Sequence, residues 1–154
     1  FVTCKMDKDR NAVLEDGKPV FGLSDQAKTV SDVAGELKSI GPILLKLTNQ
    51  AVYHTDKTLP IGAEKAPPDL WFQPAGESFL VSIFHDEHKN RYLMPVNHAV
   101  DKARELTLRF KDDAIALEVM DRKTAKWLPL VLENRVARLK LAPGDAELLR
   151  VKQE

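Results

Sequence analysis

The stretch SFLVSIFHDEHKNRYLMPVN, residues 78–97, contains two apolar runs separated by a short charged segment. Large apolar residues recur at every second position, as Phe79, Val81 and Ile83 in the first run and as Tyr92, Met94 and Val96 in the second. A period of two is typical of strands, and five or six residues between the runs suit a hairpin loop. This stretch therefore predicts a β-hairpin.

The charged segment His85, Asp86, Glu87 and His88 has three interpretations: a solvated loop, a metal site, or a contact surface for a partner or a sugar. A metal site needs three or four ligands that converge with fixed geometry, and two histidines at a hairpin tip do not supply them. We interpret the segment as a solvated loop. The other histidines with a strand context, His54 and His98, are interpreted as a structural hydrogen-bonding residue and a turn cap.

From Ala51 onwards the rest of the chain also has strand-like periodicity, with a turn about every ten residues. A clean example is residues 105–110, where Leu106, Leu108 and Phe110 alternate with polar residues. The segment 55–69 contains Pro60, Gly62 and the pair Pro67–Pro68, which predicts a loop. Such spacing predicts an antiparallel β-sandwich of eight or nine strands over residues 51–154.

Residues 1–50 form a different unit, in which a short strand and a turn precede one long amphipathic helix. Asp16–Gly17 is a turn signal, Ser24 is the expected N-cap, and Gly41–Pro42 should break or kink the helix, with further turns reaching residue 48. The apolar stripe comprises Ala27, Val30, Val33, Ala34, Leu37 and Ile40. The fold class is therefore mainly β, preceded by a short βα unit.

Composition narrows the partners. The 154 residues carry a formal net charge of +0, and no apolar run approaches the roughly 18 residues of a membrane span, so neither nucleic acid nor a membrane is an expected partner. The single cysteine, Cys4, excludes an internal disulfide. Because the sequence opens on Phe1 within a strand-like segment, we expect further polypeptide upstream.

Signs of catalysis are lacking in the sequence. It has no Gly-x-Ser-x-Gly elbow, no glycine-rich phosphate loop and no evident pair of catalytic carboxylates. We therefore expect no catalytic residue, no cofactor and no metal site. Trp71, Phe72 and Trp127 are either core residues, as is usual in a sandwich, or a platform on which a sugar stacks.

The order of motifs resembles one family. Residues 17–55 match the end of the catalytic barrel in bacterial glycoside hydrolases of the clan that includes β-galactosidases, through Gly17-Lys18-Pro19, Glu36-Leu37-Lys38, Gly41-Pro42, Leu44-Leu45, Leu47 and Val52-Tyr53-His54-Thr55. Residues 78–97 and the ending LKLAPGDAELLRV resemble the β-sandwich that follows such barrels. Pro95 replaces a strand hydrophobe of that pattern, which predicts an edge strand or a bulge.

The resemblance implies a non-catalytic C-terminal domain of a glycoside hydrolase, an accessory domain in carbohydrate metabolism whose partner is the upstream catalytic barrel of the same polypeptide. It also implies a secreted or periplasmic hydrolase. The alternative is an independent carbohydrate-binding module, with Tyr53, His54, Trp71, Phe72 and Trp127 as contacts. A protein-interaction sandwich without a sugar ligand is a third possibility. We expect the stripe of the helix 25–48 to be covered by the sandwich, or by a second copy of the chain in a homo-oligomer.

Overall fold

The computed structural model describes residues 2–9, 11–23, 25–111 and 114–153, and only the backbone at 2–4, 21–23 and 25–27. The predicted N-cap Ser24 therefore lies outside the described residues. At the N-terminal end β1 (Val2–Cys4) pairs with β4 (Phe21–Leu23), and β2 (Leu14–Glu15) pairs with β3 (Lys18–Pro19). Asp16 and Gly17 connect β2 to β3 with φ of 51° and 73°, the positive values that a two-residue hairpin turn requires, so the predicted turn is confirmed.

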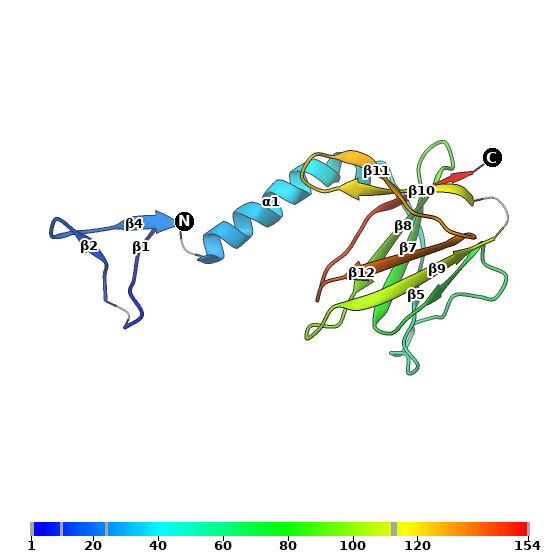
Figure 1. Ribbon diagram of the computed structural model, residues 1–154, viewed down its shortest axis with the longest axis horizontal. Coiled ribbons are helices and arrows are strands. Elements are labelled where there is room, and N and C mark those ends of the chain that lie inside the picture. Colours follow the sequence, from blue (N-terminus) through cyan, green and yellow to red (C-terminus); the bar gives the residue numbers. More distant parts are fainter. Residues whose placement is uncertain (1, 10, 24, 112–113, 154) are drawn as a thin grey trace.

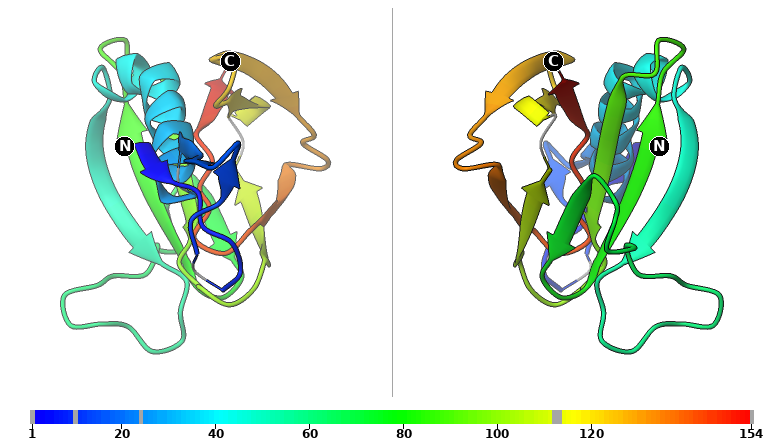
Figure 2. Two further views of the ribbon diagram at one scale, coloured as in Figure 1. Left: turned by 90° about the vertical axis from the view of Figure 1, so that its left-hand side faces the viewer. Right: turned by 90° about the vertical axis from the view of Figure 1, so that its right-hand side faces the viewer.

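Two antiparallel sheets contain the remaining strands. The larger has the order β11 (Lys126–Leu130), β10 (Ala114–Asp121), β13 (Leu149–Gln153), β8 (Arg91–Asn97), β7 (Phe79–His85) and β5 (Thr48–His54). The smaller has the order β12 (Val136–Leu141), β9 (Arg104–Phe110) and β6 (Phe72–Ala75). The predicted antiparallel sandwich is confirmed, and the expected boundary at residue 51 falls inside β5. The long connection from β5 to β6 extends away from the sheets (Figure 2).

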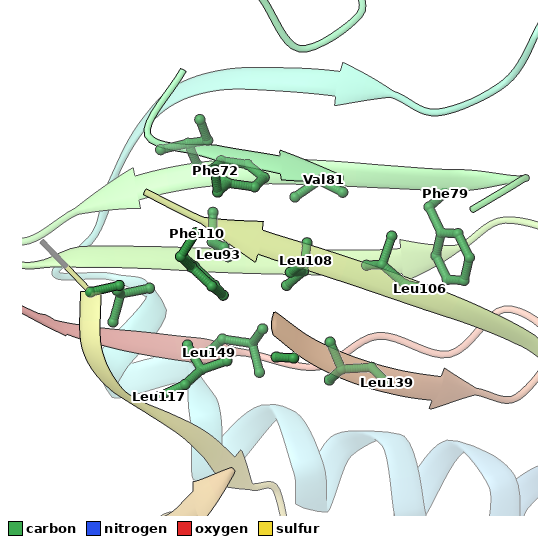
Figure 3. Close-up of a cluster of buried hydrophobic side chains, with 14 of the residues drawn as sticks. Phe72, Phe79, Val81, Leu93, Leu106, Leu108, Phe110, Leu117, Leu139 and Leu149 are labelled. Carbon is green, nitrogen blue, oxygen red and sulfur yellow. The ribbon is translucent and has the colours of Figure 1, made fainter. Parts of the chain in front are cut away.

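The opening stretch forms the predicted hairpin. Strands β7 and β8 pair from Phe79 with Asn97 to His85 with Arg91, so the loop comprises only residues 86–90. The alternation of side chains places Phe79, Val81 and Ile83 inside the sandwich. These residues meet Leu106, Leu108 and Phe110 of β9 and Leu139 of β12, and together they form the core between the sheets (Figure 3).

Strand β8 differs from its prediction. Pro95 does not lie on an edge strand, because β8 is between β7 and β13 in the larger sheet. A central position is tolerated because the ladder from β13 covers only residues 91–93 of β8 and ends before Pro95. Beyond it, the Glu147 amide donates to the Pro95 carbonyl at 3.1 Å, which uses the hydrogen-bonding group that proline retains.

The helix α1 (Asp25–Leu44) runs through Pro42 without the predicted break. Proline removes one helical hydrogen bond, and the helix ends two residues later in a tighter turn, where the amides of Lys46 and Leu47 donate three residues back. Figure 1 shows α1 leaving one end of the sandwich and carrying the N-terminal strands at its far end. Within the described residues, no helix combines the length and apolar character needed to cross a membrane.

Only the C-terminal end of the apolar stripe of α1, from Ile40 onwards, is docked on the sandwich. Ile40 is buried, and with Tyr92, Met120 and Leu148 it forms a second apolar cluster on the outer face of the larger sheet. From Val30 to Leu37 the stripe lacks such cover, since Val30, Val33 and Leu37 are 62%, 51% and 56% exposed. The sandwich therefore covers only the C-terminal end of the stripe, and the expectation that a second copy of the chain covers it stays a prediction.

Candidate functional site

His85 of the charged segment ends β7, and residues 86–90 form an ordered loop held by Asp86. Its carboxylate accepts hydrogen bonds from the amides of His88 and Asn90 at 2.9 Å each, from the Asn90 side chain at 2.7 Å and from the Tyr92 hydroxyl at 3.1 Å. Partial burial raises the pKa of Asp86, but these hydrogen bonds outweigh it and leave the pKa below its ordinary value. His88 remains exposed and lies 3.6 Å from Glu87, which agrees with the interpretation as a solvated loop.

The predicted sugar-contact residues near β6 pack against other side chains and do not form an open surface. Phe72 is 0% exposed and belongs to the core, so the expectation that it contacts a sugar is wrong, because no ligand reaches a fully buried ring. The neighbouring Trp71 ring lies 4.7 Å from the Phe72 ring, and the Arg91 guanidinium lies 4.8 Å from the Trp71 ring centre. Cation–π contact of this kind covers a ring face that a sugar would need.

Trp127 and Tyr53 lie in different surroundings. Trp127 packs with the second apolar cluster, while its ring lies 4.5 Å below the Arg150 guanidinium and 5.9 Å from the Tyr92 ring. It also lines a small cleft together with Ile43, Leu47 and His88. Tyr53 is partly buried against the sandwich core. The structure therefore does not assemble the five predicted contacts into one row.

Arg122 connects α1 to the sandwich. Its guanidinium lies 2.8 Å from Asp145, 3.2 Å from Glu36 of the helix and 3.7 Å from Glu147. Burial raises the pKa of Glu147, while the positive charge of Arg122 opposes that shift. Arg122 thus binds three carboxylates at the contact between helix and sandwich, called the helix seam below. This arrangement positions the helix, and it does not form a pair for acid–base catalysis.

A second polar cluster lies at one end of β7, and the β7–β8 loop of residues 86–90 lies at the other end. His54 ends β5, Asp56 follows it by two residues, and His98 comes directly after β8. One possible ligand atom from each of the three lies within 4.8 Å of the other two. His98 Nε2 is 2.7 Å from Asp56 Oδ2, and His54 Nδ1 is 3.9 Å from the same oxygen.

Backbone hydrogen bonds of Ser78 hold this cluster together. Its amide donates to Asp56 Oδ1 at 3.1 Å, and its carbonyl accepts from the His98 amide at 2.9 Å. Ser78 adopts a φ of 65°, which points both groups of one residue toward the cluster. The Asp56 carboxylate therefore directs one oxygen to the backbone and the other to the two imidazoles.

Asn97 fixes the turn that carries His98. This side chain is 0% exposed, and its amide nitrogen donates to the carbonyls of Lys102, Leu141 and Ala142 at 3.1, 3.1 and 2.9 Å. Its oxygen accepts from the Ala99 amide at 3.1 Å. Asn97, which ends β8, thus anchors the turn that carries His98 to the end of β12.

Sequence reasoning placed His54 and His98 in separate structural roles and overlooked Asp56. The spacing His54-Thr55-Asp56 at the end of a strand was the available signal, because alternate residues of an extended chain point the same way. His98 has no such signal, since it is 42 residues from Asp56 and reaches it only through the pairing of β5 and β8 with opposite edges of β7.

Comparison with known proteins supplies no relative for this arrangement. No family model matches the chain, no curated protein matches it, and no solved structure matches it. Likeness to known proteins therefore assigns no family to this chain, and its function is inferred from its residues and their arrangement.

Proposed function

We propose that this chain is the non-catalytic C-terminal β-sandwich portion of a glycoside hydrolase and that it supports the catalytic barrel of the same polypeptide. Two features support the proposal before any contact is considered. The motif order in residues 17–55 resembles the last barrel unit of such enzymes, and an antiparallel sandwich follows that segment as the resemblance implies.

The observation that carries the proposal is that the sandwich covers only part of the apolar stripe of α1. The apolar stripe of α1 is continuous along the sequence, yet it is covered only from Ile40 onwards, while Val30, Val33 and Leu37 are each more than half exposed. Exposed apolar stripes of this kind mark surfaces that bind further protein. We assign the covering surface to the catalytic barrel, because α1 corresponds by resemblance to its last helix.

The shifted carboxylates of the sandwich are compatible with a supporting role. Glu118 is bound by Lys152 at 2.9 Å and by Arg150, and the Lys152 hydrogen bond is the main reason why its pKa is lowered. A general acid for glycoside hydrolysis needs the opposite shift. Glu147 does have a raised pKa, but Arg122 binds it together with Asp145 at the helix seam.

The first test is activity of the chain alone. We expect no turnover of aryl glycosides by folded protein, with circular dichroism used to verify the sandwich. Measurable hydrolysis by the folded chain would overturn the proposal. The same preparation, analysed by affinity electrophoresis on several polysaccharides, tests the alternative carbohydrate-binding module, for which strong retardation is the expected result.

The second test addresses the exposed stripe. The triple variant Val30→Ser, Val33→Ser, Leu37→Ser should leave the isolated chain nearly unchanged, because these side chains are already exposed. In a longer polypeptide that includes the barrel, it should lower the thermal midpoint. The matched control is Val100→Ser with Val131→Ser, at sites that are 89% and 69% exposed on the sandwich.

Equal effects of the triple variant and its control in the longer polypeptide would contradict a supporting role through α1. Sedimentation of the isolated chain distinguishes the competing occupant. A dimer that the triple variant dissociates would assign the stripe to a second copy of the chain instead of to the barrel.

A further inference from the structure

His54, Asp56 and His98 form a polar cluster that the proposed supporting role does not use. The three come from two separate segments, the end of β5 and the turn after β8, and they converge at one end of the sandwich. His54 and Asp56 are largely buried, with 20% and 22% of their side-chain surfaces exposed, whereas His98 is 39% exposed. Two members of the cluster are therefore largely buried, and the third, His98, is accessible to solvent.

We propose that these three side chains bind a divalent transition-metal ion of the zinc type, with water in the remaining position. Two imidazoles and one carboxylate are ligands that suit zinc and its neighbours rather than calcium or magnesium, which prefer sites made only of oxygen. Three protein ligands are the number found where zinc retains an exchangeable fourth ligand.

The spacing fits such an ion after small side-chain rotations. Zinc bonds of about 2.0–2.2 Å in a tetrahedral site place neighbouring ligand atoms about 3.3 Å apart. Around Asp56 Oδ2 the observed distances are 2.7 Å to His98 Nε2 and 3.9 Å to His54 Nδ1, which lie on either side of that value. The third pair, between His54 and His98, lies within 4.8 Å, so the exposed His98 side chain has to rotate toward His54 to close the site.

An independent observation points to a missing ligand. His54 Nδ1 is buried and has no hydrogen-bond partner within the part of the chain that the structure describes, although buried polar atoms are usually satisfied. The 3.9 Å to Asp56 Oδ2 is too long for a hydrogen bond. A cation between the two imidazoles and the carboxylate would satisfy this nitrogen, while the direct His98–Asp56 contact alone leaves it without a partner.

The surrounding backbone preorganises the cluster. Ser78 binds Asp56 Oδ1 and the His98 amide, so it leaves Asp56 Oδ2 directed at the imidazoles. The His54 amide donates to the Glu64 carbonyl at 2.8 Å, which holds the end of β5. Outer contacts of this kind orient metal ligands and typically change affinity by about 10–100-fold when removed.

Equilibrium titration of the chain, free of any histidine tag, with zinc sulfate against a chromophoric chelator tests this inference. We expect one zinc ion per chain, a rise in thermal midpoint on zinc addition, and a visible absorption band when cobalt(II) replaces zinc. The variants Asp56→Asn and His98→Ala should each weaken zinc binding at least about tenfold. Asp56→Asn keeps an oxygen for the Ser78 amide, so it tests ligation without dismantling the turn.

The matched control is His88→Ala, which removes an exposed histidine from the β7–β8 loop and should leave affinity and stoichiometry unchanged. Absence of stoichiometric zinc binding by the folded chain would overturn the inference. Binding that Asp56→Asn and His98→Ala leave intact would overturn it as well, because the ion would then lie elsewhere. Neither result depends on the supporting role proposed above, which is tested by glycoside turnover and barrel stability.

Discussion

Replacing Asn97 with alanine would remove the buried amide that ties the end of β8 to the end of β12. The side chain is 0% exposed, donates to three carbonyls and accepts from one amide, so it satisfies four backbone groups at once. The truncation leaves those groups without this partner. We expect a large loss of stability from a change that removes no apolar surface.

The size of this loss depends on how accessible each hydrogen-bonded backbone group is to water. The bond to the Leu141 carbonyl is buried, and an acceptor left unsatisfied there costs about 1–3 kcal/mol. The bonds to Lys102, Ala142 and Ala99 are part-buried and the two amide hydrogens are shared among three carbonyls, so these three bonds together contribute about 1 kcal/mol. Asn97→Ala should therefore lower the free energy of unfolding by about 3 kcal/mol, out of the 5–15 kcal/mol typical of a domain.

Urea denaturation followed by tryptophan fluorescence measures this change. With a slope of about 1–3 kcal/mol per molar urea, the midpoint should fall by about 1–3 M without a change in slope. Asn49→Ala, at an exposed position of β5, is the control and should stay within about 0.5 kcal/mol of the parent. Asn97→Asp keeps the shape but directs a carboxylate at three carbonyls, so it should be worse than alanine at neutral pH and recover partly on acidification, because burial and the facing carbonyls raise the pKa of such a carboxyl. A stable Asn97→Ala, or an aspartate as good as asparagine at neutral pH, would refute the reasoning.

Three further predictions concern the helix seam, a backbone turn and the hairpin loop. Arg122→Ala should lower stability by about 1 kcal/mol and speed amide exchange in α1, because three carboxylates at the seam lose their common cation. Gly76→Ala should lower the free energy of unfolding by at least about 2 kcal/mol in urea titrations, since the φ of Gly76 is 146° and an added Cβ would lie 2.8 Å from the Glu105 carbonyl oxygen. Its control is Gly35→Ala on α1, where an added Cβ meets open space, and this change should stabilise the protein by up to about 1 kcal/mol. Asp86→Ala should destabilise at neutral pH, and because the folded state lowers the pKa of Asp86, the difference from the parent should shrink as acidification protonates that carboxylate, which pH-dependent unfolding measures.

Local patterns were sufficient for most of the strands. The alternation of Phe79, Val81 and Ile83 correctly predicted a strand with one buried face, and the charged segment that follows forms the loop except for His85, which ends β7. In β10 strict alternation would place Ile115 on the same face as the buried Leu117, but Ile115 is 55% exposed because an irregularity in the pairing of β10 with β13 shifts the register between Ala114 and Ala116. One residue of shift moves a side chain to the other face, and sequence periodicity does not reveal it.

The amino-acid sequence by itself determined the mainly β class, the Asp16–Gly17 turn, the β7–β8 hairpin and the amphipathic helix, because each depends on neighbours within a few residues. Only the tertiary structure decided that β8 lies inside a sheet despite Pro95, that the stripe of α1 docks only at its C-terminal end, and that His98 meets Asp56. These features depend on which strands pair and in what register, and that choice is made by the summed burial of side chains from distant segments. No short stretch of the chain encodes it.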